Sequence, residues 1–207
     1  ARLQPGFFCM CGIVALVGSR EAAPQLLEGL RQLEYRGYDS AGIATVAAQG
    51  QLTCLRAKGK LRNLTACVDT EGAPGQCGIG HTRWATHGKP EERNAHPHRS
   101  SDGAVAVVQN GIIENHRVLR EQLEASGVVF QSETDTEVIP HLLAAELQQL
   151  QAAGGTPGGG LLLAALQQVL PKLEGAYALA VIWDQAPGAL VVARKAAPLL
   201  IGLGEGE

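Results

Sequence analysis

The stretch AYALAVIWDQAPGALVVA at 176–193 holds two apolar runs separated by a short segment containing Pro and Gly, and in AGIATVAAQGQLTCLRA at 41–57 a segment containing Gly likewise separates two runs. Runs of this kind, bounded by turn residues, predict pairs of strands that are adjacent along the chain. Further strands are predicted at 13–17, 77–81 and 104–109. Many of these runs are apolar throughout rather than alternating, which favours strands that are covered on both faces.

Helical periodicity separates the other strands. Apolar residues recur at helical spacing over 26–33, 118–123, 138–150 and 161–173. Adjacent strand pairs with helical segments between them favour a layered α+β sandwich over a doubly wound parallel sheet. The glycine-rich segment at 154–160 predicts a loop between the last two helices.

The sequence Thr134-Asp135-Thr136-Glu137 fits a capping box, because Glu follows Thr by three residues before an apolar run. If Thr134 caps the helix, Asp135 takes the first helical position, at a loop–helix junction where ligand contacts are common. Pro140 conflicts with this start because an interior proline removes a helical hydrogen bond. The helix therefore either starts later or bends at Pro140.

Composition excludes several classes of protein. Apolar residues make up 45% and charged residues 18% of 207, which indicates a globular chain rather than a disordered one. The net charge of −3 and the lack of a basic block argue against nucleic acid or an anionic membrane as a partner. No apolar run is long enough to span a membrane. Five cysteines without a CxxC pair indicate a reducing compartment, and we expect a cytoplasmic protein.

Cys11 lies at the start of an apolar run, where most free cysteines are simply small buried hydrophobes. However, Met10 precedes it, and a Met followed by Cys is a plausible translation start. If translation starts at Met10, removal of that methionine makes Cys11 the first residue of the chain. Its α-amine, with a reference pKa of about 7.7–8.0, can then accept the thiol proton, so that the residue supplies both nucleophile and base.

The motif HTRWATHG at 81–88 packs Arg83, Trp84, Thr86 and His87 before a glycine. The alternative is a strand that ends in a polar surface loop, against which stands the grouping of Arg, Trp, Thr and His side chains in one short segment. Arg presents a rigid fork suited to a carboxylate, and Trp can close over a small ligand. The histidines here and in His96-Pro97-His98 follow no metal-binding motif, so we expect no metal site.

Asn110-Gly111 directly follows a strand and is first of all a turn signal. The alternative is an oxyanion hole, in which a side-chain amide and an adjacent backbone N–H hold one developing negative oxygen. The segment Tyr35-Arg36-Gly37 is typical of a turn between a helix and a strand.

Taken together, these motifs resemble the N-terminal glutaminase domains of the glutamine–fructose-6-phosphate aminotransferase family, in order and over nearly all of 11–207. YRGYDS and the Arg-Trp block are the most specific. The motifs that carry the resemblance are CGIV at 11–14, LEYRGYDSAG at 33–42, GHTRWATHG at 80–88, NAHPH at 94–98, NGIIENH at 110–116, SETDTEV at 132–138, EGAYAL at 174–179 and PLLIGLG at 198–204.

The resemblance implies a four-layer αββα sandwich of the N-terminal nucleophile hydrolase type, acting on L-glutamine through a cysteinyl thioester without metal or organic cofactor. It implies a full-length homodimer in which missing sugar-isomerase domains bind fructose-6-phosphate. It also implies residue roles. Cys11 is the expected nucleophile, Asn110 and Gly111 the oxyanion hole, Arg83 and Asp135 the partners of the glutamine α-carboxylate and α-ammonium, Trp84, Thr86 and His87 the pocket, and Arg36 a structural support.

The sequence departs from the family pattern at Ala15, Gln109 and Pro140, and above all in residues 1–10. An extended amine cannot act as the base. We therefore expect residues 1–10 to be a tag, a mis-assigned start or a segment removed in the active form, and 11–207 to be a glutaminase domain truncated at its C-terminus.

Two other interpretations stay open at this point. One is the glutaminase half of a phosphoribosyl amidotransferase, although such relatives carry RGQDS or RGPD in place of the RGYDS found at 36–40. The other is a non-catalytic domain that has kept the fold.

Overall fold

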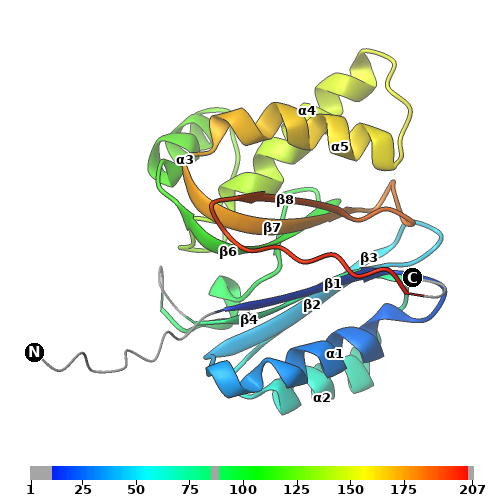
Figure 1. The fold of residues 1–207 in the computed structure, drawn as a ribbon. Helices are drawn as coiled ribbons and strands as arrows, with labels where there is room; N and C mark the ends of the chain where they lie inside the picture. Colours follow the sequence, from blue (N-terminus) through cyan, green and yellow to red (C-terminus); the bar gives the residue numbers. More distant parts are fainter. Residues whose placement is uncertain (1–10, 85–88, 205–207) are drawn as a thin grey trace, which may run out of the picture.

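The computed structural model describes residues 11–84 and 89–204, which form two antiparallel sheets stacked face to face between helices (Figure 1). The first sheet has the strand order β1-β4-β2-β3. Every neighbouring pair in it is antiparallel, with Gly12 of β1 opposite Thr82 of β4. Its strands are β1 (Gly12–Val17), β2 (Ser40–Val46), β3 (Leu52–Lys58) and β4 (Cys77–Arg83).

The second sheet has the order β5-β6-β7-β8 and is also antiparallel throughout. The adjacent strands predicted within 176–193 and 41–57 are confirmed as the pairs β7–β8 and β2–β3. The short strand β5 was not predicted. The strands of this sheet are β5 (His98–Arg99), β6 (Val105–Ile113), β7 (Gly175–Trp183) and β8 (Val191–Lys195).

Helices cover the outer face of each sheet (Figure 1). The first sheet is covered by α1 (Ala22–Gln32) and α2 (Leu61–Glu71), and the second by α3 (His116–Ala125), α4 (Val138–Ala152) and α5 (Gly159–Val169). Short 3-10 turns are η1 (Glu34–Arg36), η2 (Glu92–Asn94) and η3 (Leu170–Lys172). No helix in the described part of the chain is long and apolar enough to cross a membrane.

Alternation along the strands builds three apolar cores. In β2, Ile43 packs with the leucines of α1, whereas Ala44 packs between the sheets. In β6, Val107 faces the helices α3–α5 and Val108 faces the other sheet. Because the side chains of a strand point to opposite faces in turn, a strand buried on both sides must be apolar throughout. The predicted four-layer α+β sandwich is confirmed.

The predicted cap of α4 is wrong. The helix begins at Val138 with Glu137 as the N-cap residue, and the Thr134 hydroxyl instead lies 2.9 Å from His98 Nε2. The Glu137 carboxylate turns back to accept hydrogen bonds from the chain before it, which starts the helix later. Pro140 is consequently the third helical residue, where a backbone N–H has no partner within the helix, so the helix tolerates it.

Helix α2 was missed by the sequence analysis. Only Leu61 and Leu64 are buried on it, and its remaining residues are polar or partly exposed. A single narrow apolar stripe of this kind gives a weak periodic signal.

Candidate active site

One cavity of about 1240 Å³ is lined by most of the residues that the sequence analysis selected. The antiparallel pairing of β1 and β4 places the start of one strand at the end of the other, so Cys11 meets Arg83 and Trp84. Strand β6 of the second sheet brings Asn110 and Gly111, and the turn before α4 brings Asp135. Residues separated by more than 100 positions therefore converge on one site.

The Cys11 sulfur contacts the main chain of Trp84. Its Sγ lies 3.2 Å from the Trp84 N–H, which donates to it, and 3.6 Å from the Trp84 carbonyl oxygen. Burial raises the pKa of the Cys11 thiol, and the Trp84 N–H and the Arg83 guanidinium offset this only in part. The thiol is therefore protonated at neutral pH and needs a base to become a nucleophile.

Asn110 of β6 contacts two residues of the first sheet's side of the cavity, Cys11 and His81. Its Nδ2 donates to the Cys11 carbonyl oxygen at 3.0 Å, while its Oδ1 lies 2.7 Å from His81 Nε2. The next residue, Gly111, has φ = +124°, and a Cβ atom there would lie 2.1 Å from the Ala176 carbonyl oxygen. Only glycine fits this backbone, so the kink in β6 beside Asn110 depends on Gly111.

Arg83 and Asp135 supply opposite charges from different layers, and both are buried, at 3% and 4% exposure. The Arg83 guanidinium lies 3.6 Å from the Asp39 carboxylate. The Asp135 Oδ2 accepts the Ile113 N–H at 2.7 Å, which ties the turn before α4 to the end of β6. A ligand with a carboxylate and an ammonium group finds a complement for each in this cavity.

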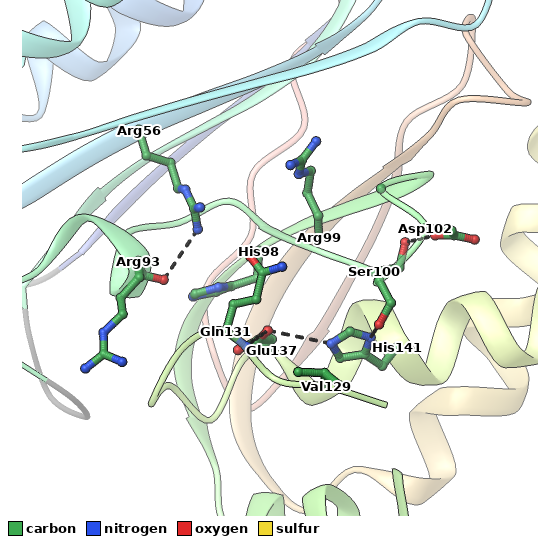
Figure 2. A pocket seen from close by; sticks show the side chains of 12 residues that line it. Arg56, Arg93, His98, Arg99, Ser100, Asp102, Val129, Gln131, Glu137 and His141 are labelled. Atoms are coloured by element: carbon green, nitrogen blue, oxygen red, sulfur yellow. Dashed lines mark hydrogen bonds and ion pairs between the residues drawn. The ribbon is translucent and has the colours of Figure 1, made fainter. Parts of the chain in front are cut away.

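Glu137 stabilises the turn that carries Asp135 through hydrogen bonds to the main chain before it. Its carboxylate accepts the N–H groups of Gln131 and Ser132 at 2.8 and 2.7 Å and lies 3.6 Å from His141 Nε2. Burial alone raises the pKa of Glu137, but the neighbouring His141 and the hydrogen bonds from Gln131 and Ser132 lower it to about 2. Figure 2 shows Glu137 facing His141 in a second cavity, of about 220 Å³.

Some predicted site residues lie outside the described part of the chain. Thr86 and His87 fall in the undescribed segment 85–88, and of Arg36 only the backbone, in η1, is described. Trp84 lines the cavity, is 44% exposed and contributes its main chain to the contact with Cys11.

Three buried histidines near the site were missed as a unit. The ring of His81 stacks on that of His96 at 4.3 Å between centroids, and His96 meets the edge of His98 at 4.7 Å. Within the described residues, no group of three or more His, Cys, Asp or Glu side chains has an arrangement that could hold a metal ion. Their spacing in GHTRWATHG and NAHPH gave no signal that they stack.

Comparison with known proteins identifies curated relatives of high sequence identity. Glutamine–fructose-6-phosphate aminotransferase [isomerizing] of Thermosynechococcus vestitus is 59% identical over 198 residues, which is 96% of this chain and 30% of the relative. The corresponding enzyme of Mycolicibacterium smegmatis is 50% identical over 204 residues, again 96% of this chain and 32% of the relative. The chain thus spans about a third of the length of these relatives.

Among solved structures, the glutamine phosphoribosylpyrophosphate amidotransferase of B. subtilis superposes with a TM-score of 0.63 at 30% identity, over 84% of this chain and 35% of that one. This likeness confirms the sandwich as one of the N-terminal nucleophile hydrolase type. The family described as a glutamine amidotransferase domain matches residues 81–206, more than half of the sequence. The chain belongs to the glutamine amidotransferase domain family.

Proposed function

We propose that this domain hydrolyses L-glutamine to glutamate and ammonia through a thioester on Cys11, and that in its full-length form the ammonia aminates fructose-6-phosphate. The observation that carries the proposal is the convergence of the Cys11 sulfur, the Asn110 amide and the opposite charges of Arg83 and Asp135 on one cavity. The 59% identity to an aminotransferase, against 30% to a phosphoribosyl amidotransferase, favours the sugar as acceptor.

Substrate binding follows from the charges. Arg83 pairs with the α-carboxylate of glutamine and Asp135 with its α-ammonium, which selects an amino acid over a simple amide. The side-chain carboxamide then extends toward Cys11. Thr86, His87 and Trp84 complete the pocket in this proposal, with Arg36 as a support.

The chemical step begins with a base, because the Cys11 thiol is protonated when buried. We propose that residues 1–10 are absent from the active form, so that the α-amine of Cys11 takes the thiol proton. The Sγ then bonds to the carboxamide carbon, and Asn110 Nδ2 and the Gly111 N–H stabilise the resulting oxyanion. The amine returns the proton to the leaving nitrogen, the C–N bond breaks, and ammonia departs.

Water completes the cycle. It adds to the thioester carbonyl, the C–S bond breaks, and glutamate leaves with the thiol restored. Every step uses groups of this chain, substrate or water, so the atoms balance without a cofactor.

Glutamate release by a protein that begins at Cys11 tests the proposal. Cys11→Ala should abolish release, whereas Cys67→Ala, a partly buried cysteine on α2 away from the cavity, should keep it within about 2-fold of the parent. A glutamine-like electrophile should label Cys11 and no other cysteine. Retention of activity in Cys11→Ala, or full activity in protein that still carries residues 1–10, contradicts the mechanism.

A further inference from the structure

His81 bridges the two sheets at the active site. It lies on β4, two residues before Arg83, and is 1% exposed. Its Nε2 is 2.7 Å from the Oδ1 of Asn110 on β6. The histidine touches the amide from the side opposite to Cys11.

The hydrogen-bonding capacities of these groups fix where each proton lies. The Cys11 carbonyl oxygen can only accept, so the Asn110 atom 3.0 Å away must be the Nδ2 donor. The Asn110 Oδ1 then faces His81, and because an amide oxygen can only accept, His81 Nε2 must carry a hydrogen. Burial lowers the pKa of His81 to about 4, so the neutral ring has one proton and places it on Nε2.

The His81 ring is itself held in place. It stacks on the His96 ring at an interplanar angle of 18°. His96 Nδ1 accepts the Gln109 N–H at 3.3 Å, and the residue after Gln109 is Asn110. The stacked rings of His81 and His96 are therefore attached to β6, the strand that carries the Asn110 side chain.

We infer that His81 is a positioning residue for the hydrolysis of glutamine: its Nε2–H holds the Asn110 amide with Nδ2 toward Cys11, so that an N–H rather than a carbonyl oxygen meets the developing oxyanion. The inference rests on the proposed function. Without His81, rotation of the amide by half a turn presents Oδ1 to the oxyanion, which repels it.

The test compares His81→Leu, which removes the donor, with His81→Gln, whose Nε2 amide can replace it. Loss of an oxyanion donor costs about 100- to 1,000-fold in kcat, and loss of its orientation should cost about 10- to 100-fold. For His81→Leu we expect a decrease in kcat of about 10- to 100-fold, with KM for glutamine changed by less than about 3-fold. For His81→Gln we expect kcat to recover to within about 5-fold of the parent.

A double-mutant cycle separates positioning from a general loss of structure. If His81 acts through Asn110, adding His81→Leu to Asn110→Ala should change kcat by less than about 3-fold. Ile79→Ala is the matched control, because Ile79 is fully buried between the sheets on the same strand; it should lower stability and leave kcat unchanged. If His81→Leu does not fold, His81→Asn, which is too short to reach Asn110, takes its place.

The outcomes distinguish a failure of this inference from a failure of the proposed function. Parent-like kcat in His81→Leu, or an equal loss in the Asn110→Ala background, overturns the role of His81. If Asn110→Ala itself keeps full kcat while Cys11→Ala is inactive, the oxyanion hole is wrong instead; if Cys11→Ala is active, the proposed function falls whatever His81 does.

Discussion

Mild acid should unfold this domain because three imidazoles are buried without charge. Burial lowers the pKa of His81 to about 4 and of His98 to about 3, and it lowers that of His96 well below its usual range. Arg83 and Arg56 oppose the protonation of His96 and His98, whereas the Glu137 carboxylate favours that of His98 without reversing the effect of burial. The histidines of the unfolded chain have a pKa of about 6.5, so below that pH the unfolded state binds protons that the folded state does not.

The sign and size follow from linkage. Above about pH 6.5 neither state binds these protons, so their contribution to stability is complete; below it the unfolded state gains, and stability falls with pH. At 1.36 kcal/mol per unit, His81 and His98 each cost about 3 kcal/mol by pH 4. Their sum is comparable to the whole stability of a typical domain, about 5–15 kcal/mol.

Glu137 adds to this loss at lower pH. Its folded pKa of about 2 lies below the unfolded value, so its contribution is present above about pH 4.5 and lost as pH falls toward 2. The histidines therefore dominate between pH 6.5 and 4.5.

Urea unfolding followed by circular dichroism at several pH values between 5 and 7 measures the effect. Three buried histidines predict a slope of about 4 kcal/mol per pH unit near pH 5.5. His98→Asn should lower that slope by about 1 kcal/mol per unit, the share of one proton. A free energy of unfolding that stays level from pH 7 to 5, or an unchanged slope in His98→Asn, refutes the reasoning.

Three further substitutions test the packing and the site. Gly111→Ala forces a side chain into the Ala176 carbonyl at positive φ, and should cost at least about 3 kcal/mol in urea unfolding; parent-like stability contradicts the kink. Leu143→Ala, at a fully buried position of α4, should cost about 2–5 kcal/mol, against less than about 0.5 for Leu163→Ala, which is 46% exposed; equal losses contradict the assigned core. Asp135→Asn keeps an acceptor but loses the charge, so KM for glutamine should rise about 10- to 100-fold with the fold intact; an unchanged KM refutes the ammonium contact.

The layered fold was predictable because its strands are buried on both faces. The run at 176–183 contains no charged residue, and β7 is correspondingly enclosed by α-helices on one side and a sheet on the other. Cys11 was a site candidate because Met10 precedes it, and Asp135 because a capping box at Thr134 predicts it in the first helical turn; the structure places Asp135 in the turn before α4 instead, and both residues line the cavity. Local sequence carries both kinds of signal.

Long-range contacts were not predictable from local patterns. Glu137 matches a capping box, yet it binds Gln131 and Ser132, which precede it, and leaves Thr134 to His98. Likewise, nothing within GHTRWATHG or NAHPH indicates that His81 and His96 stack, because the stacking depends on how β4 lies over the 94–98 segment. Tertiary geometry decided both cases.

The pairing of Gly12 with Thr82 has a consequence for protein engineering. The proposed nucleophile is suspended from a main-chain ladder, so its location does not depend on the identity of the attacking atom. Oxygen or selenium installed at residue 11 should encounter the same surroundings as sulfur. The scaffold can therefore serve to compare nucleophiles while the architecture stays constant.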